Sequence, residues 1–344
     1  MARMIDVANR AGVSIKTVSR VLNNEPHVKE SLRDKVRTAA AEVGYVPSTT
    51  ARALRSRRSY AIHLVSHSHR SAYVNAIQFG AVQTCQQRGY QLMVSLMEDL
   101  RDMPEADLIA RFERLMAASK PDGLILVPPL SNDERLYGVL ERFDVPVARV
   151  GPNNLPDARI IVKINEREAA RELTEHLISL GHTRIAFVRG KEDQNATHER
   201  FAGYRDALDG AGIALDEALV QPGDFNFPTG LEAGDALFAL ANRPTAVFAA
   251  NDDMAAGVLM SAHRLRIDVP DDLSVVGFDD SEIAEKMWPA LTTVRQPLLT
   301  MGNEATRQLI DAATNQLPGM QDVPNEYLDY EIIHRDSTGP APRN

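Results

Sequence analysis

Two basic side chains, Lys16 and Arg20, lie four residues apart in the segment 11–23, which reads AGVSIKTVSRVLN. This spacing puts both side chains on one face of a helix. Val18 and Val21 lie on the other side and form an apolar stripe. Lys and Arg donate hydrogen bonds to guanine O6 and N7, and Arg can donate two at once. The segment therefore predicts a helix whose chemistry suits base edges in a DNA major groove.

The neighbouring side chains of this helix add two further kinds of contact. Ile15 is suited to touch a thymine methyl group. Short hydroxyl and amide donors suit phosphate oxygens, which set the register on DNA rather than the sequence read. The candidate phosphate-contacting residues are Ser14, Thr17, Ser19 and Asn23. The alternative, a three-helix packing module with a solvated charged face, is not excluded by these residues alone.

Two more helices are predicted around the first. Gly12 tolerates the positive φ of a tight turn, and Ser14 is a good N-cap for the helix that follows. A third helix is predicted from about Ser31 to Val43, where Gly44 stops it. The apolar positions with helical spacing before the turn are Ile5, Val7, Ala8 and Ala11. This arrangement is a helix–turn–helix with a supporting helix.

A basic segment follows, in which Pro47 ends the preceding element and TTARALRS allows about two turns of helix. A helix this short is not stable alone. We expect a hinge that becomes helical against DNA, with Leu54 wedged into the minor groove. The alternative is a flexible basic linker whose Leu54 packs on the next domain. The clustered arginines are Arg52, Arg55, Arg57 and Arg58.

Charge and composition favour a polyanion contact at one end of the chain. Residues 1–60 carry 12 Lys+Arg against 5 Asp+Glu, a net of +7. Because the 344-residue chain has a net charge of −9, the remainder carries −16. The single cysteine, Cys85, excludes an internal disulfide and a multi-cysteine metal site. With no membrane-length apolar run and no signal peptide, we expect a cytoplasmic protein of two or three domains.

From residue 60 onward, short apolar runs alternate with amphipathic helical patterns. The predicted strands lie at 60–66, 90–96, 122–128, 145–151, 184–190, 219–221, 245–252 and 273–279. The predicted helices lie at about 72–88, 104–118, 133–143, 167–182, 198–212, 227–240 and 254–265. Such alternation predicts an α/β fold with two doubly wound parallel sheets of about five strands each, covered by helices on both faces.

Polar side chains follow several predicted strands, where ligands bind in folds of this kind. The candidate effector-binding residues are Tyr73, Arg200, Phe225, Asn251 and Asp279. Sugar hydroxyls both donate and accept hydrogen bonds, and the C–H face of the ring packs on an aromatic ring. These residues therefore suit a sugar buried between two lobes. Polar and aromatic residues near these strand ends also have structural alternatives: Asp252 and Asp280 could cap helices, Arg200 could pair with an acid, and Phe225 could belong to the core.

The N-terminal segment resembles the headpiece and hinge of the lactose-repressor/galactose-repressor (LacI/GalR) family of bacterial transcription regulators. The resemblance rests on AGVS, TVSRVLN, GYVP and ARALR in their order. It implies that Ile15, Lys16 and Arg20 read bases and that Leu54 intercalates at the hinge. The residues it places against the DNA backbone are Ser14, Thr17, Ser19, Asn23, His27 and Tyr45, and we add Arg55 of the hinge.

The rest of the chain also resembles the family, in LGHTRIAFVRG, PTAVFAANDDMAAGVL and VPDDLSVVGFDDSE. The resemblance implies two lobes joined by three crossovers, as in periplasmic sugar-binding proteins. Arg200, Asn251 and Asp279 match positions that hold sugar hydroxyls, and Phe225 matches an aromatic that stacks on the ligand. The implied domains are a headpiece 1–46, a hinge 47–59, a core 60–335 and a disordered tail 336–344. The core divides into an N-lobe, about 60–161 plus 293–323, and a C-lobe, about 162–292 plus 324–335.

There are departures from the family pattern. Gly151 stands where the lactose repressor has a ligand-binding acid, and Lys163 and Asn165 lie in a stretch that is often acidic in relatives. Purine-responsive members lack an Asn at the position of Asn251, so a carbohydrate is favoured over a nucleobase. The tail contains no leucine heptads of the kind that tetramerise the lactose repressor, which favours a homodimer.

We therefore expect a repressor of sugar-utilisation genes. It binds a pseudo-palindromic double-stranded operator and is released by a mono- or oligosaccharide effector. A plain sugar-binding protein, or a corepressor- or activator-type regulator with a non-sugar effector, is the alternative. No G-x-S-x-G, Walker loop, H-E-x-x-H or C-x-x-C motif is present, so we expect no enzyme activity, no cofactor, no metal and no membrane contact.

Overall fold

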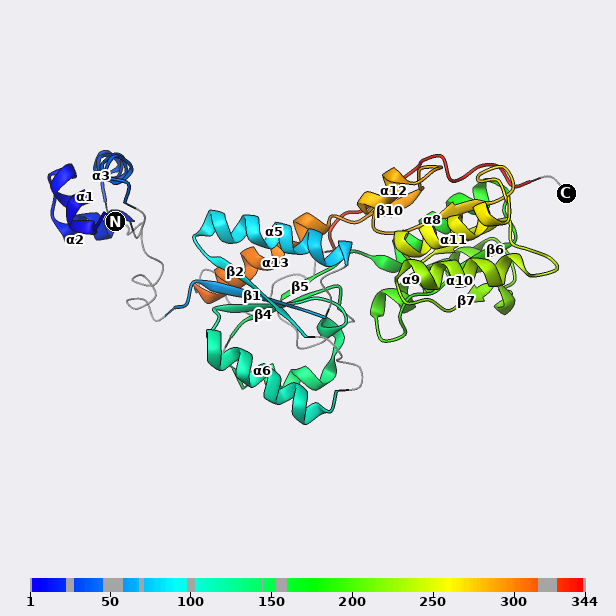
Figure 1. Cartoon of the computed structure of the whole chain (residues 1–344), viewed down its shortest axis with the longest axis horizontal. Coiled ribbons are helices and arrows are strands. Elements are labelled where there is room, and N and C mark those ends of the chain that lie inside the picture. The colour runs from blue at the N-terminus through cyan, green and yellow to red at the C-terminus, as the bar shows by residue number, and fades with distance from the viewer. Residues whose placement is uncertain are drawn as a thin grey trace. The chain divides into compact units, whose positions relative to one another are not determined.

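The computed structural model describes residues 2–22, 28–45, 58–67, 71–97, 103–140, 142–143, 145–152, 160–314 and 327–342. The chain divides into two compact units, Met1–Tyr60 and Ala61–Asn344, and Figure 1 shows both. Within the described ranges, no helix is long and apolar enough to cross a membrane. The same ranges hold no group of three or more His, Cys, Asp or Glu side chains placed to bind a metal ion.

The first unit is a three-helix domain made of α1 (Met4–Ala11), α2 (Ile15–Leu22) and α3 (Glu30–Glu42). The three predicted helices are confirmed. Gly12, with φ 60°, makes the turn between α1 and α2. The buried core of the three-helix domain consists of Val7, Ala8, Ala11, Val18, Val21, Val36, Ala39 and Ala40. Ile5 shares the helical spacing but is 42 % exposed, because the side of α1 that packs in the core is the one with Val7, Ala8 and Ala11.

The second unit begins with a five-stranded parallel sheet in the order β2-β1-β3-β4-β5. Its strands are β1 (Ala61–Ser66), β2 (Gln91–Leu96), β3 (Gly123–Leu126), β4 (Val147–Val150) and β5 (Ile160–Val162). Four of these strands were predicted from the sequence, and β5 was not. The order reverses between β1 and β3, and the carboxyl ends of strands at such a point form a binding crevice.

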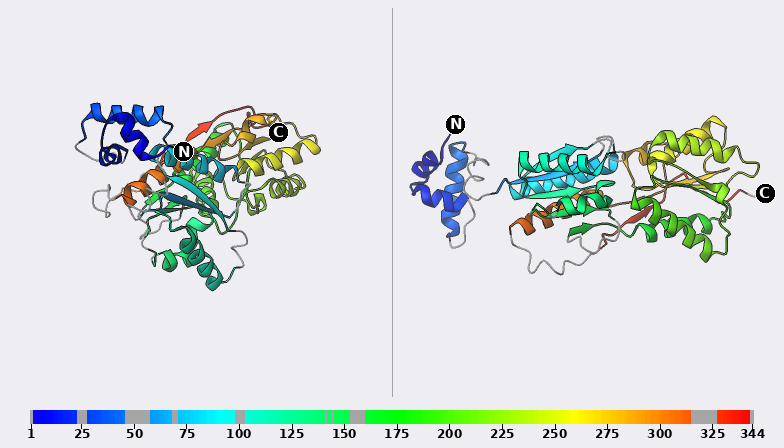
Figure 2. Two further views of the ribbon diagram at one scale, coloured as in Figure 1. Left: turned by 60° about the vertical axis from the view of Figure 1, so that its left-hand side comes forward. Right: turned by 90° about the horizontal axis from the view of Figure 1, so that it is seen from below.

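Helices cover both faces of this sheet, as Figures 1 and 2 show. One face is covered by α5 (Ala72–Arg88) and α13 (Leu298–Ala313), and the other by α6 (Glu105–Ser119) and α7 (Tyr137–Leu140). The helix predicted over 133–143 is mostly replaced by two 3₁₀ turns, Leu130–Asn132 and Glu134–Leu136. Asp133 Oδ1 accepts hydrogen bonds from the backbone N–H and the Nε of Arg135, which holds that turn.

The C-lobe contains a four-stranded parallel sheet in the order β7-β6-β8-β9. Its strands are β6 (Ile185–Val188), β7 (Val220–Gln221), β8 (Ala246–Ala249) and β9 (Ser274–Val276). Its helices are α8 (Glu166–Ser179), α9 (Asn195–Gly210), α10 (Phe227–Phe238), α11 (Asp252–Arg264) and α12 (Glu282–Lys286), with a 3₁₀ turn at Glu217–Leu219. The predicted class, two doubly wound α/β lobes with a helical headpiece, is confirmed.

Three segments connect the two lobes. The first crossover, residues 163–165, leads from β5 into α8. The second, residues 292–297, contains β10 (Thr293–Arg295) and leads into α13, and the third, residues 327–335, contains β11 (Glu331–Ile333). β10 and β11 pair antiparallel with each other, so the second and third crossovers form a small sheet of their own.

The prediction of a disordered tail over 336–344 is wrong for residues 336–342. The backbone N–H of Val275 in β9 donates to Ser337 O at 2.9 Å, and the Ser337 hydroxyl donates to Val275 O at 2.6 Å. Further along, Gly339 N–H donates to Ser274 Oγ, and Ala341 N–H donates to Leu180 O at 2.9 Å. The polar composition suggested disorder, but the C-lobe supplies hydrogen-bond partners for this backbone.

Candidate DNA-binding face and effector site

The second helix of the headpiece separates its apolar and basic sides as predicted. Val18 and Val21 are at most 1 % exposed, whereas Ile15 is 45 % exposed. Lys16 and Arg20 are also exposed. The helix thus presents one apolar and two basic side chains outside the headpiece core. Their contacts with DNA stay a prediction.

The first turn of α2 is held by its own hydroxyl groups. Ser14 Oγ accepts a hydrogen bond from Thr17 N–H at 3.1 Å, and the two hydroxyl oxygens lie 2.9 Å apart. Ser14 therefore caps the helix, as its position predicted. Its bond with Thr17 orders the turn that carries Ile15 and Lys16.

The remaining candidate DNA contacts divide into two groups. Ser19 is half-buried on α2, and Tyr45 packs its ring partly against the headpiece core. Four others, Asn23, His27, Leu54 and Arg55, lie outside the described residues. Most of the predicted hinge lies outside them as well, so its helix and its wedge stay predictions.

Arg200 of α9 is the centre of a buried charged cluster in the C-lobe, and its side chain is 3 % exposed. Its Nε donates to Glu166 Oε2 at 2.6 Å, and one terminal nitrogen donates to Ala250 O. The other terminal nitrogen lies 3.6 Å from Asp279 Oδ1. The guanidinium carbon also lies 3.6 Å from the ring centre of Phe278. The alternative that Arg200 pairs with an acid is therefore observed, and the pairing holds the guanidinium in place.

Asp279 lies in the loop after β9 and faces the same cluster. Its Oδ1 accepts a hydrogen bond from Gln296 Nε2 at 2.7 Å. Burial raises the pKa of the Asp279 carboxyl above its ordinary value, while the positive charge of Arg200 acts in the opposite direction. Two acidic side chains, Glu166 and Asp279, thus share the buried guanidinium of Arg200, and their oxygens retain acceptor capacity for the hydroxyl groups of a ligand.

Asn251 and Phe225 are bonded to each other beside this cluster. Asn251 Nδ2 donates to Phe225 O at 3.2 Å, and Asn251 Oδ1 accepts from Met254 N–H at 3.0 Å. Asn251 is therefore the N-cap of α11. The Phe225 ring lies 5.9 Å from the guanidinium carbon of Arg200 and against the backbone of Gly190, where a Cβ would come within 2.0 Å of the ring.

Tyr73, in the first turn of α5, is the N-lobe member of the site. Burial and the carboxylates of Glu166 and Asp279 raise the pKa of its hydroxyl. Gly151, one of the departures from the family pattern, has φ 58° and lies beside the Tyr73 oxygen. A Cβ at Gly151 would lie 3.1 Å from that oxygen, so a larger residue there would need a strained backbone and a small shift of Tyr73.

The structure thus brings all five predicted effector residues together and adds two that the sequence did not reveal. Glu166 opens α8 and carried no signal, because an acid in the first turn of a helix is common. Gln296 lies in the second crossover, and its Oε1 is buried without a hydrogen-bond partner. A donor from a ligand would satisfy that oxygen.

The fold and the site define a class: a helix–turn–helix headpiece in one chain with a two-lobed core like that of periplasmic binding proteins. Sequence comparison agrees. Residues 3–48 match the family described as "Bacterial regulatory proteins, lacI family", and residues 174–338 match the "Periplasmic binding protein-like domain".

Individual relatives cover almost the whole chain. The HTH-type transcriptional repressor PurR of Vibrio campbellii is 36 % identical over 318 residues, which are 90 % of this chain and 92 % of that one. A structure of a CelR–cellobiose complex has a TM-score of 0.73 at 32 % identity and covers 98 % of this chain and 100 % of that one. The lac repressor dimer bound to operator and an anti-inducer has a TM-score of 0.77 at 27 % identity, with 98 % and 99 % covered. The chain belongs to the lacI family of bacterial regulatory proteins, which confirms the resemblance.

Proposed function

We propose that this protein represses sugar-utilisation genes and leaves its operator when a carbohydrate binds between the lobes of the core. One observation carries the proposal: the Arg200–Glu166–Asp279 cluster, with the Phe225 ring beside it, lies in the same chain as an exposed basic recognition helix. A repressor needs both a DNA-reading surface and a ligand-reading one.

The chemistry of the cluster suits an uncharged polyhydroxylated ligand. Its carboxylates accept hydrogen bonds from hydroxyl groups, and the Gln296 amide supplies a further unused acceptor. The Phe225 ring offers a face for the C–H side of a sugar ring. The CelR structure that this chain resembles holds cellobiose. A nucleobase or another non-sugar effector is the alternative.

We infer that the protein works as a homodimer. Two recognition helices one helical turn of DNA apart read the two halves of a pseudo-palindromic operator. The lac repressor structure that this chain resembles is a dimer on its operator. Exposed apolar side chains suited to such a contact lie on α5 and on the edge strand β2: Phe79, Met93, Val94 and Leu96, each 41–57 % exposed. Phe79→Asp should dissociate the dimer in sedimentation experiments, and Gln78→Asp is its control.

The proposed function also implies that the protein is not an enzyme, and it implies where in the cell the protein acts. The relatives are transcription regulators, and we propose that this chain binds its carbohydrate without turning it over. A regulator of operator DNA acts where that DNA lies, so we place the protein in the bacterial cytoplasm, on the nucleoid when bound. Recovery of chemically unchanged sugar after prolonged incubation with the protein would agree with this, and steady turnover would contradict it.

The proposed function is tested by selecting operators from random duplex DNA with the full-length protein. The selected operator is then challenged with cellobiose, a panel of other sugars, and nucleobases as the alternative class. We expect a pseudo-palindromic operator and release by a carbohydrate. Asp279→Ala should bind operator but no longer respond, whereas Glu232→Ala, an exposed acid on α10, should respond normally. Failure to prefer any duplex over bulk DNA would overturn the proposal.

A further inference from the structure

Asp279 and Asp280, the third and fourth residues after β9, are adjacent in sequence but have separate partners. Asp279 faces Arg200 and Gln296 in the effector site. Asp280 is bonded instead to the crossovers between the lobes. Both residues have a positive φ, 114° and 52°, in a conformation that side-chain-bearing residues rarely adopt. Such a backbone persists only when surrounding contacts hold it.

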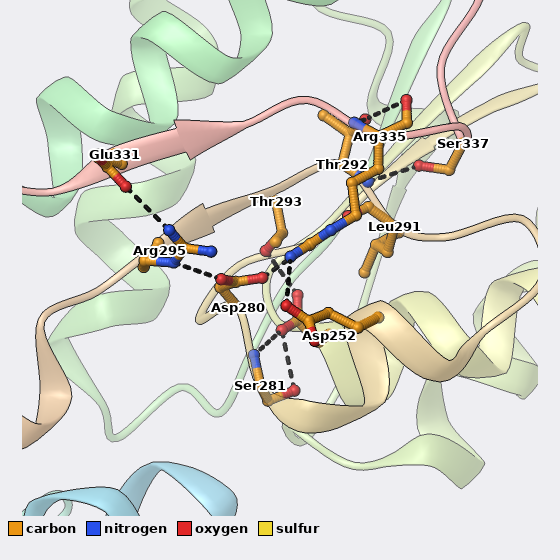
Figure 3. Close-up of polar contacts among 11 residues, drawn as sticks. Asp252, Asp280, Ser281, Leu291, Thr292, Thr293, Arg295, Glu331, Arg335 and Ser337 are labelled. Atoms are coloured by element: carbon orange, nitrogen blue, oxygen red, sulfur yellow. Dashed lines mark hydrogen bonds and ion pairs between the residues drawn. The ribbon is translucent and has the colours of Figure 1, made fainter.

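The contacts of Asp280 come from the second and third crossovers (Figure 3). Arg295 of β10, in the second crossover, donates from Nε to Asp280 Oδ2 at 2.6 Å. Arg335, at the end of the third crossover, forms an ion pair with Asp280 Oδ1 at 2.7 Å. The Asp280 side chain is 5 % exposed, so these two arginines replace its hydration.

The arginines are themselves anchored to different places. Arg295 also bonds Glu331 Oε2 of β11 at 3.0 Å, which ties the two crossovers together. Arg335 also donates to Leu291 O at 2.9 Å and lies 3.2 Å from Glu285 Oε1, both in the C-lobe. Asp280 is therefore the one side chain among these that contacts the guanidinium groups of both crossovers.

Asp252, at the start of α11, holds the other side of the same loop. Its Oδ2 accepts from the backbone N–H and the hydroxyl of Ser281 at 2.7 and 2.9 Å. Its Oδ1 accepts from the Thr293 hydroxyl of β10 at 2.7 Å. In addition, Asp279 N–H donates to Val294 O of β10 at 2.9 Å. The loop 279–281 is thus joined to β10 by hydrogen bonds of both Asp252 and Asp279.

We propose that Asp280 is a positioning residue that couples effector binding at Asp279 to the arrangement of the two lobes, by tying the loop 279–281 to the second and third crossovers through Arg295 and Arg335. The inference rests on the proposed function. Asp280 does not touch the effector. It transmits a change in the position of Asp279, caused by effector binding, to the second and third crossovers, which connect the two lobes. Coupling between effector and operator is reciprocal, so loss of this link weakens the effect in both directions.

The experiment measures coupling separately from binding. For wild type and variants, operator affinity is determined with and without the releasing sugar, for which cellobiose and the sugar panel are the probes. Sugar affinity is measured without DNA by calorimetry, and folding is checked by thermal unfolding. The coupling is the ratio of the two operator affinities. Asp280→Asn should keep sugar affinity within about threefold of wild type, and its coupling ratio should fall at least tenfold.

Three further variants make the test robust. Arg295→Gln removes the bond to Asp280 at a side chain that is 46 % exposed, so it should fold even if Asp280→Asn does not, and it should also lose coupling. Glu331→Gln removes only the Arg295–Glu331 pair and should keep most of the coupling. Arg295→Lys, which preserves the charge opposite Asp280, should restore part of the ratio that Arg295→Gln loses.

The outcomes separate this inference from the proposed function. A wild-type coupling ratio in folded Arg295→Gln and Asp280→Asn would overturn the role of Asp280. So would a ratio that falls only in step with sugar affinity, because Asp280 would then belong to the binding site. If no probe releases the wild type, the proposed function fails first, and this inference falls with it.

Discussion

The basic face of α2 and the Arg200 cluster use charged side chains in opposite ways. Lys16 and Arg20 are exposed, and their placement depends on the geometry of a single eight-residue helix. Arg200 is 3 % exposed, and its partners come from α8, from the end of β8 and from the loop after β9. The basic groups of α2 lie at the surface, whereas Arg200 has exchanged water for acidic side chains.

This difference predicts whether removing a charged group changes DNA binding or folding stability. Removing an exposed basic group of α2 should affect binding and leave folding almost unchanged. Removing Arg200 should affect folding first, because it leaves two buried carboxylates without their cation. The predictions below, from the largest expected effect to the smallest, test this contrast.

Arg200→Met should lower the free energy of unfolding by about 3–5 kcal/mol, since Glu166 and Asp279 would stay buried without a positive partner. Denaturant unfolding of the full chain, followed by circular dichroism, measures the change. Arg205→Met, at an exposed position on the same helix, is the control and should change stability little. Equal losses in the two variants would contradict the special position of Arg200.

Arg20→Ala should weaken binding to the selected operator by about 1–3 kcal/mol, because a bidentate contact with guanine would be lost. Binding to random DNA should weaken much less. Fluorescence anisotropy at fixed salt measures both affinities. Arg37→Ala, at an exposed site on α3 of the same unit, serves as the control. An equal loss on operator and random DNA would remove Arg20 from the base-reading residues.

Asp279→Asn should remove a pH dependence of stability that the wild type possesses. Burial raises the pKa of Asp279 above its unfolded value, so the folded protein binds the proton more tightly. The wild type should therefore lose stability relative to Asp279→Asn as pH rises from about 4 through the raised pKa. The slope for one proton is at most about 1.4 kcal/mol per pH unit. Unfolding at a series of pH values measures it, and parallel profiles would contradict the raised pKa.

Ser14→Ala should destabilise the start of α2 by about 1 kcal/mol, through loss of the bond that Thr17 N–H donates. Faster amide exchange in the first turn of α2, measured in the full chain, reports the change. Ser31→Ala, on α3, should leave the exchange of α2 unaltered. If Ser14→Ala also leaves it unaltered, packing against α1 and α3 alone orders the helix.

The headpiece shows how much a sequence predicts when the relevant forces are local. The sequence alone predicts three features of this domain: the helical spacing of Val18 and Val21, the cap at Ser14 and the turn at Gly12. They concern residues a few positions apart, whose geometry the backbone dictates. The alternation of strands and helices predicted the fold class of the core for the same reason.

The candidate effector site shows where such prediction ends. Its five expected residues were proposed from strand ends and from family resemblance, but nothing in the sequence paired Glu166 with Arg200 or Gln296 with Asp279. These contacts join residues 34 and 17 positions apart. The prediction of a disordered tail was wrong for a related reason. Residues 336–342 have a polar composition, but composition does not reveal that β9 forms hydrogen bonds with them.

By itself, the amino-acid sequence determined a basic three-helix headpiece, an α/β core and a family. It did so because periodicity, capping and turn chemistry act within one helix or strand. Only the tertiary structure decided that one guanidinium would serve two carboxylates and that Asp280 would contact two crossovers. Those choices depend on which groups lose their water together, and burial is a property of the folded chain.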